Sequence, residues 1–299
     1  MNIVFFGEDS FSNIVLQSLI DSEFDVILVV SPYYDNFIHK RLENTCTSNQ
    51  IEFIRVPNFS DISFIKKLKS LAPEMIVISH FEKLLRSEII EIPKFGCINL
   101  HPSLLPYYRG MAPQHWPIIN GENETGVTVH SIDQTADTGD IILQRKVKIE
   151  TNMYVSDLQL EFLKIYKSII VDAINLTQQE HFKSIKQSFL EGSYYGKLKK
   201  NQCQISLENS CSQTINLIRG VSKPYFGAFI DDLIIWRAHI ANEIESKKIM
   251  TNSKLGLNFS EEIGFFLKFK DGNIIIEKHE KKLNENETTN NKYSARDSS

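Results

Sequence analysis

Short apolar runs rich in β-branched residues recur through the first hundred positions and alternate with segments of helical pattern. The runs Asn2–Phe6, Phe24–Ser31 and Met75–Ser79 have the composition of strands that are buried on both faces of a parallel sheet. Segments such as Asp61–Ala72 carry apolar residues at helical spacing. Because helical crossovers join parallel strands, this alternation favours an α/β, doubly wound, Rossmann-like sheet, with Gly96–Leu100 as another central strand.

The pattern changes in the second half of the chain. Thr125–Ile132 and Ile141–Ile149 alternate and are expected to pair as strands, and Val155–Thr177 has helical spacing. After one more helix, Ser210–Val221, several short strand-like runs indicate a small β-rich domain. The expected divisions are an α/β catalytic domain over 1–180, a connector over 181–205, a β-rich domain over 206–280 and a disordered tail over 281–299.

Composition excludes several classes of protein. The net charge of -4 and the pI near 6.1 give no overall attraction to nucleic acid or to an anionic membrane. The N-terminus has no basic leader, and no apolar run approaches the roughly 18 residues of a membrane span, so a cytoplasmic protein is expected. The four cysteines form no CxxC pair, which argues against a disulfide framework and a zinc site.

Two polar residues stand where the strand Gly96–Leu100 ends. Asn99 and His101 are two apart, so on a strand their side chains point to the same face. Pro102 removes a hydrogen-bond donor and ends the ladder, which leaves His101 at the strand mouth. The alternative is a solvated strand end with an incidental histidine, and these two residues alone favour neither interpretation.

Asp137 adds a carboxylate in a turn that contains Gly139. A carboxylate near a histidine fixes its tautomer and supports proton transfer near neutral pH. The alternative, a simple turn former, is preferred for Asp133 and Asp140. His115 and His130 match no compact metal-ligand spacing with His101, so we expect no metal site and interpret both as ordinary buried or surface histidines. There is no GxGxxG and no Walker loop.

The motif Asn-x-His-Pro-Ser-Leu-Leu-Pro from Asn99 and the later Asp-x-Gly-Asp-Ile from Asp137 resemble the folate-dependent formyltransferase family. The resemblance covers about residues 1–176 and is looser over 210–240. It implies that Asn99, His101 and Asp137 are catalytic and that a primary amine attacks the formyl carbon of 10-formyltetrahydrofolate. Asn99 would then bond the developing oxyanion, His101 would take the amine proton and Asp137 would orient His101.

The family resemblance also implies where the folate binds. Family members hold the pterin largely through backbone groups, which points to the loops 79–84 and 133–137. The residues expected to contact the folate are Phe81, Leu84, Leu104, Asp133 and Gly139.

The acceptor is the harder question, because the family includes both sugar-nucleotide and methionyl-tRNA formyltransferases. The tRNA enzymes use a basic loop after the second strand and a positively charged C-terminal domain. Here that loop lacks a glycine- and lysine-rich run, and residues 201–280 contain 9 Lys/Arg and 10 Asp/Glu. A near-neutral domain is a poor clamp for phosphates, so we expect no nucleic-acid partner.

We therefore expect a nucleotide-linked amino sugar as acceptor, such as a dTDP-4-amino-4,6-dideoxyhexose for surface polysaccharide. The alternatives are a methionyl-tRNA formyltransferase, a formyltetrahydrofolate hydrolase, which usually carries an additional N-terminal domain, and a non-catalytic folate-binding protein. Spare strand edges in the second domain favour a homodimer.

The residues expected to bind the acceptor lie in two loops and the second domain. Arg109 or Lys83 would meet the diphosphate, because a guanidinium offers a planar fork to phosphate. Ser103 lies in the same loop as Arg109. Tyr225 would stack on the base, and its alternative role is packing between domains.

Overall fold

The computed structural model describes residues 1–34, 38–188, 191–249 and 253–282, which divide into two compact units. The first unit comprises Met1–Pro117, Asn123–Thr151 and Asp157–Lys197, and the second comprises the short segments Ile118–Glu122 and Asn152–Ser156 and the chain from Leu198 onward. The tail that was expected to be disordered lies, from residue 283, outside the described residues.

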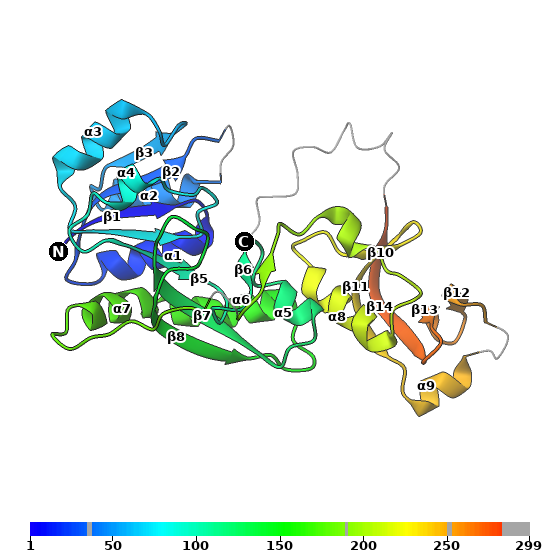
Figure 1. Cartoon of the computed structure of the whole chain (residues 1–299). Coiled ribbons are helices and arrows are strands. Elements are labelled where there is room, and N and C mark those ends of the chain that lie inside the picture. The colour runs from blue at the N-terminus through cyan, green and yellow to red at the C-terminus, as the bar shows by residue number, and fades with distance from the viewer. Residues whose placement is uncertain (35–37, 189–190, 250–252, 283–299) are drawn as a thin grey trace. The chain divides into compact units, whose positions relative to one another are not determined.

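The first unit is built on one seven-stranded sheet with the order β3-β2-β1-β4-β5-β7-β8 (Figure 1). Its elements are β1 Asn2–Gly7, α1 Ser10–Ile20, β2 Asp25–Pro32, α2 Lys40–Ser48, β3 Phe53–Val56, α3 Ile62–Leu71, β4 Met75–Ser79, α4 Ser87–Ile90, β5 Cys97–His101, β6 Arg109–Gly110, α5 Trp116–Ile119, β7 Glu124–Ser131, β8 Ile141–Lys148, α6 Val155–Tyr166, α7 Ile169–Thr177 and β9 Tyr194–Tyr195. α5 continues into the second unit, and α6 begins there.

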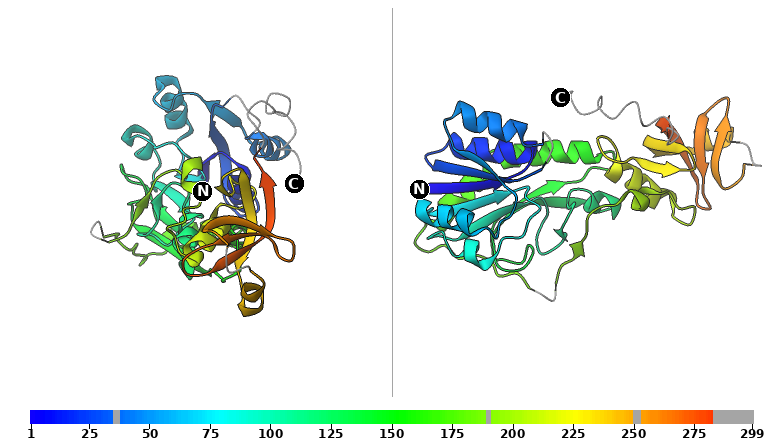
Figure 2. Two further views of the ribbon diagram at one scale, coloured as in Figure 1. Left: turned by 90° about the vertical axis from the view of Figure 1, so that its right-hand side faces the viewer. Right: turned by 90° about the horizontal axis from the view of Figure 1, so that it is seen from above.

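The first five strands of this sheet pair in parallel, as their apolar composition predicts. The central strands are buried along nearly their whole length; β4, for example, is buried at all five positions. Helices lie on both sides of the sheet (Figure 2). α1 contacts α2, and α3 contacts α4, as expected when the crossovers run in opposite directions from the centre. This confirms the doubly wound α/β class.

Two antiparallel strands extend the sheet beyond β5. β7 pairs antiparallel with β5, and β8 pairs antiparallel with β7. The strand pair predicted from the alternation of residues 125–149 is therefore present. Its importance lies in the register, which places His130 of β7 opposite Asn99 of β5.

The segment after α7 returns to the first unit rather than only connecting two domains. Ile185 forms a bridge with Ile141 at the start of β8, and β9 pairs in parallel with β6. Tyr195 of β9 stacks between Tyr108 and Trp116, with ring centroids 5.2 and 4.9 Å away. The polar composition of this stretch gave no sign of these contacts.

The sequence pattern missed several local features. The single helix expected over Val155–Thr177 is two helices, α6 and α7, and the break falls at Lys167 and Ser168. Ser168 is the residue before α7, and Arg145 of β8 donates a hydrogen bond to its hydroxyl group (Nη1 to Oγ, 2.8 Å). The region after β2 that was interpreted as a loop contains the helix α2.

The second unit is a small β-domain with one main helix, as predicted. Its elements are a 3-10 turn Lys200–Cys203, α8 Cys211–Val221, β10 Ala228–Ile230, β11 Leu233–Ile240, α9 Glu243–Lys248, β12 Gly256–Ser260, β13 Gly264–Lys268 and β14 Asn273–Lys281. The five strands form an open antiparallel sheet with the order β10-β11-β14-β13-β12. Ser210 caps α8 by accepting a hydrogen bond from the backbone N–H of Gln213. In the described part of the chain, no helix is long and apolar enough to cross a membrane.

Candidate active site

The loops that follow β1, β4 and β5 meet at one edge of the first sheet. β2 and β3 lie on one side of β1, whereas β4 and β5 lie on the other, so the direction of the crossovers reverses between β1 and β4. Open α/β sheets bind ligands outside the carboxyl ends of the strands at such a point. Asp9, His80 and Pro102 follow these three strand ends closely.

Asn99 and His101 lie on one face of β5, as their spacing predicts. The imidazole of His101 is 5% exposed, and its Nε2 lies 2.9 Å from the backbone carbonyl of Tyr108. A carbonyl only accepts, so Nε2 carries the proton and Nδ1 is the atom that can take another. Burial lowers the pKa of His101, although the carboxylate of Asp137 acts to raise it. The imidazole is therefore a neutral proton acceptor near pH 7.

Asp137 lies beside His101 in the turn between β7 and β8. Its Oδ1 is 3.6 Å from Nδ1 of His101 and 3.6 Å from Nε2 of His130, and its Oδ2 accepts a hydrogen bond of 2.8 Å from the backbone N–H of Gly110. Burial acts to raise the pKa of Asp137, but the two histidines and this hydrogen bond lower it well below its ordinary value. The carboxylate stays ionised and stabilises positive charge on His101.

Hydrogen bonds from a side-chain amide and a close backbone contact fix the turn that carries Asp137. The side-chain amide of Gln187 donates to the carbonyls of Asp137 and Gly139, at 2.9 and 2.7 Å. A Cβ atom at Gly139 would lie 1.8 Å from the carbonyl oxygen of Ser131, so only glycine permits this approach. Asp137 itself has a φ of +57°, a left-handed conformation that is uncommon for a residue other than glycine.

His130 is the main site residue that the sequence analysis undervalued. It is buried, its Nδ1 lies 2.8 Å from the carbonyl of Ser131, and its Nε2 lies 3.1 Å from Nδ2 of Asn99. The alternation of β7 could have indicated its face, because Thr128 and His130 share one side of the strand. The register with β5, which brings His130 to Asn99, has no local signal.

Two residues that were expected to bind the acceptor lie inside the fold. Arg109 is 8% exposed, and its guanidinium donates to Oε1 of Gln187 at 3.1 and 2.8 Å and to the carbonyl of Ser188 at 3.2 Å. Ser103 is fully buried, and its hydroxyl donates to the carbonyl of Tyr107. Both side chains are engaged in internal bonds rather than presented to a ligand, because the segment after α7 packs over this loop.

The residues expected to contact the folate differ in their exposure and in their neighbours. Leu84 and Lys83 are exposed in the loop after β4, whereas the ring of Phe81 packs against Phe6 and Phe59, with centroids 5.4 and 5.3 Å away. Asp133 accepts hydrogen bonds from Thr135 and Thr138, the turn-forming role that was preferred for it. The remaining two positions are Leu104, which packs near Gly126, and Gly139 in the Asp137 turn. Tyr225 is half-buried in the second unit.

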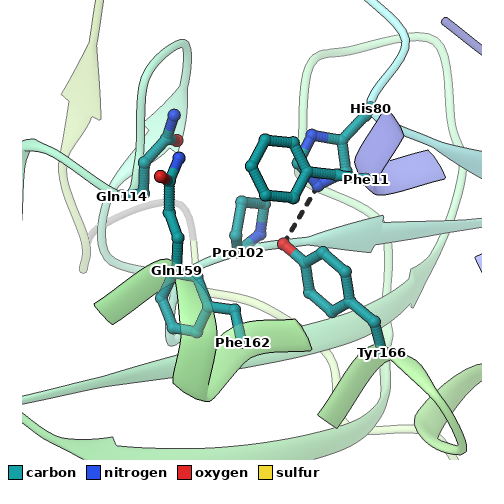
Figure 3. Close-up of a pocket in the computed structure, with 7 residues that line it drawn as sticks. All are labelled: Phe11, His80, Pro102, Gln114, Gln159, Phe162 and Tyr166. Atoms are coloured by element: carbon teal, nitrogen blue, oxygen red, sulfur yellow. Dashed lines mark hydrogen bonds between the residues drawn. The ribbon is translucent and has the colours of Figure 1, made fainter. Parts of the chain in front are cut away.

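A small pocket, partly open to solvent, lies at the edge of the sheet where β4 and β5 end (Figure 3). Two phenylalanines contribute apolar surface, and four other side chains contribute polar groups. The lining residues are Phe11, His80, Pro102, Gln114, Gln159, Phe162 and Tyr166. Among the described residues, no group of three His, Cys, Asp or Glu side chains is arranged to hold a metal ion.

Sequence comparison relates most of the chain to known enzymes. Residues 1–174 match the family described as Formyl transferase, and residues 197–292 match Formyl transferase, C-terminal domain. The methionyl-tRNA formyltransferase of Clostridioides difficile is 34% identical over 261 residues, which cover 84% of each chain. The methionyl-tRNA formyltransferase of Alkaliphilus metalliredigens is 32% identical over 93% of this chain and 90% of that protein.

Solved structures with the same fold include enzymes that act on sugars. The sugar 3N-formyl transferase WlaRD, crystallised in the presence of dTDP and 5-N-formyl-THF, is 25% identical, with a TM-score of 0.69 over 95% of this chain and 98% of that one. The N-formyltransferase from Helicobacter canadensis shares the fold, with 24% identity and a TM-score of 0.67 over 92% of this chain and 98% of that one. With both of its domains matched and the Asn–His–Asp cluster assembled on its first sheet, the chain belongs to the formyl transferase family.

Proposed function

We propose that this enzyme transfers the formyl group of 10-formyltetrahydrofolate to the amine of a nucleotide-linked amino sugar. The observation that carries the proposal is the cluster of Asn99, His101 and Asp137. The ionised carboxylate of Asp137 lies beside the neutral imidazole of His101, and His130 links the carboxylate to the amide of Asn99. An amide N–H, a neutral base and a carboxylate are the groups that acyl transfer to an amine requires.

Each member of the cluster has one role in the reaction. The amine nitrogen attacks the formyl carbon, and the carbonyl oxygen becomes an oxyanion that accepts a hydrogen bond from the amide of Asn99. Nδ1 of His101 takes a proton from the attacking nitrogen and returns it to N10 of the departing tetrahydrofolate. Asp137 stabilises the imidazolium during this transfer. An oxyanion donor of this kind lowers the activation barrier by about 3–4 kcal/mol.

The polarity of the pocket supports a sugar as the acceptor. A hexose ring presents apolar C–H faces together with hydroxyl groups. The pocket offers the rings of Phe11 and Phe162 and the polar groups of Gln114 and Gln159. A site built to hydrogen-bond hydroxyls discriminates against a ligand that lacks them, because its polar groups are then left unpaired. The apolar thioether of methionine satisfies none of these groups.

The charge of the chain is a second support. The near-neutral balance of residues 201–280 offers little to the phosphates of tRNA. At the edge of the first sheet, however, Lys197 lies 3.5 Å from Glu82, next to the exposed Lys83. We propose that Lys83 and Lys197 hold the diphosphate of the nucleotide, a role for which the buried Arg109 is less suited.

Methionyl-tRNA is the second candidate acceptor, and a specific observation favours it. The curated relatives named above carry that name and are 34% and 32% identical over most of this chain. The two candidates make opposite predictions about which substrate is turned over.

The test compares turnover of the two kinds of acceptor. The purified enzyme is incubated with 10-formyltetrahydrofolate and either dTDP- or UDP-linked amino sugars or charged initiator tRNA, and formylated products are measured by mass spectrometry. We expect turnover of a dTDP-4-amino-4,6-dideoxyhexose. Formylation of the tRNA alone would overturn the sugar proposal and leave the formyl-transfer chemistry in place, and release of formate without an acceptor would indicate a hydrolase.

Base recognition is tested separately at Tyr225, which we propose stacks on the nucleotide base. Calorimetric titration with a nucleoside diphosphate should give weaker binding for Tyr225→Ala than for the unmodified enzyme, because base–aromatic stacking contributes about 1–3 kcal/mol. Unchanged affinity means that Tyr225 only packs within its unit. The folate contacts of the two loops, the homodimer and the cytoplasmic location stay predictions.

A further inference from the structure

A second aspartate–histidine pair lies at the edge of the pocket, outside the Asn99 cluster. Nδ1 of His80 is 3.5 Å from Oδ2 of Asp9, and Nε2 of His80 is 3.0 Å from the hydroxyl of Tyr166. Figure 3 shows the imidazole and the phenol facing each other, with Gln114 and Gln159 on the other side of the view. His80 and Tyr166 line the pocket, whereas Asp9 contacts His80 and is not a lining residue.

The position of His80 is fixed on several sides. Its backbone has a φ of +48°, in the left-handed region, directly after β4. Its ring stacks on Phe11 with a centroid distance of 5.3 Å and an interplanar angle of 20°. A non-glycine residue in this conformation is uncommon, and such residues cluster at functional sites. The surrounding contacts thus hold the imidazole between Asp9 and Tyr166.

Asp9 is an ionised partner for this imidazole. Burial acts to raise the pKa of Asp9, but His80 and the N–H donors of the first turn of α1 lower it below its ordinary value. Its Oδ1 caps α1 by accepting from the backbone N–H groups of Phe11 and Ser12, which leaves Oδ2 for His80. The carboxylate therefore favours a proton on Nδ1 of His80 and leaves Nε2 to accept from Tyr166.

We infer that Tyr166 and His80, oriented by Asp9, form a proton relay that removes a proton from the acceptor's ammonium group before it attacks the formyl carbon. This inference rests on the proposed function, in which the pocket receives the acceptor. Aliphatic amines are mostly protonated at neutral pH, and an ammonium nitrogen has no lone pair with which to attack.

The relay moves one proton from the acceptor to His80 in two transfers. The ammonium N–H is donated to the phenolic oxygen of Tyr166, the Tyr166 proton passes to Nε2 of His80, and the resulting imidazolium is stabilised by Asp9. The neutral amine then attacks, and His101 moves the second proton to the leaving folate nitrogen. One proton per turnover remains on His80 and is released to solvent, which matches an overall reaction of an ammonium and a formyl amide giving a new formamide and tetrahydrofolate.

Among the described residues, two titratable groups contact His80 directly. Asp9 faces it from the start of α1, and Tyr166 faces it from α6. His101 of β5 is within electrostatic reach, because His80 acts to lower the pKa of His101. The other pocket residues are uncharged.

The pH dependence of kcat/KM tests the relay. It is measured with the acceptor that the turnover comparison under Proposed function identifies. At pH 7 we expect His80→Gln to lower kcat/KM by about 10–100-fold. This loss should decrease about tenfold for each unit of pH increase until the pH reaches the pKa of the acceptor's amine. The reason is that the variant reacts only with acceptor molecules whose amine is already unprotonated. Tyr166→Phe should give the same rising profile, and Asp9→Asn, which retains the helix cap, a smaller shift in the same direction.

His239→Gln is the matched control. His239 lies on β11 of the second unit between Glu245 and Glu277, and the same substitution there should leave the profile unchanged. If His80→Gln fails to fold, as judged by thermal unfolding, Tyr166→Phe decides the question. Profiles of the variants that run parallel to that of the unmodified enzyme overturn the relay, whichever acceptor is turned over. Turnover of charged tRNA with a rising variant profile instead removes the sugar proposal and retains the relay.

Discussion

The two aspartate–histidine pairs of the first sheet are alike in distance and different in their third partner. Nδ1 of His101 is 3.6 Å from Asp137, and Nδ1 of His80 is 3.5 Å from Asp9. Nε2 of His101 donates a hydrogen bond to the backbone carbonyl of Tyr108, whereas Nε2 of His80 is hydrogen-bonded to the hydroxyl group of Tyr166. A carbonyl fixes one tautomer, and a hydroxyl can both donate and accept. The first pair thus keeps Nε2 of His101 protonated and leaves Nδ1 as the single atom that exchanges a proton, whereas the second pair can pass a proton between Tyr166 and His80.

The supports of the two pairs differ as well. Asp137 is held by backbone and amide donors in a turn that returns over the sheet, and His101 is buried at 5% exposure. Asp9 is a helix cap, and His80 is half-buried in a pocket that reaches solvent. Burial suits a base that must remain neutral. Access to solvent suits a group that must release its proton after each turnover.

The largest expected effect is at His101. His101→Gln should lower kcat by about 10²–10⁴-fold, the usual contribution of a general base. Unlike the loss in His80→Gln, this loss should persist at pH 9, because raising the pH cannot return a proton to the leaving folate. Steady-state kinetics from pH 6 to 9 measure it. Recovery of His101→Gln at high pH would mean that the two histidines have the same role.

Asp137→Asn is expected to have the next largest effect, a fall in kcat of about 10–10³-fold, because an amide no longer stabilises the imidazolium of His101. Its stability should also change with pH. The folded-state pKa of Asp137 is lowered, so its carboxylate stabilises the fold above its unfolded pKa of 3.8, and this contribution is lost as pH falls below that value. The free energy of unfolding of Asp137→Asn should therefore fall less steeply than that of the unmodified enzyme as the pH decreases below 3.8. Equal acid sensitivity of the two proteins contradicts this assignment.

Gln187 tests the scaffold of the first pair. Its amide joins the turn of Asp137 to the guanidinium of Arg109. Gln187→Ala should lower the free energy of unfolding by about 1–3 kcal/mol, because buried partners lose their bonds. It should also lower kcat by about tenfold with KM little changed, since the turn moves and the pocket does not. A raised KM alone would place Gln187 in acceptor binding.

The smallest effect concerns Glu8, next to Asp9. Burial raises the pKa of Glu8 to about 7, and its carboxylate accepts a hydrogen bond of 2.6 Å from the backbone N–H of Glu82. A raised folded pKa means that stability falls as pH rises from the unfolded value of 4.5 towards 7. Glu8→Gln should add about 1–3 kcal/mol to the free energy of unfolding at pH 8 and nothing at pH 4. Denaturant titrations at both values check the sign, and stabilisation at pH 4 contradicts it.

The sequence predicted those features that local pattern determines. The parallel strands, the strand pair of residues 125–149 and the common face of Asn99 and His101 follow from periodicity and composition. Asp137 was chosen from its glycine-containing turn. The burial of Arg109 could not be predicted, because it depends on Gln187, 78 positions away in a polar stretch with no strand signal. His130 was set aside for a similar reason, since its role depends on the register between β5 and β7.

The close approach of Gly139 to Ser131 has a consequence for engineering this enzyme. Since no side chain fits at Gly139, the turn that carries Asp137 packs directly against the backbone of Ser131. Substitutions in this turn are therefore poorly tolerated. The pocket, by contrast, is lined mainly by side chains from α1, α6 and the segment before α5, together with His80 and Pro102. A library that varies Phe11, Gln114, Gln159 and Phe162 and leaves residues 126–140 intact is the design most suited to changing the acceptor while keeping the formyl-transfer chemistry.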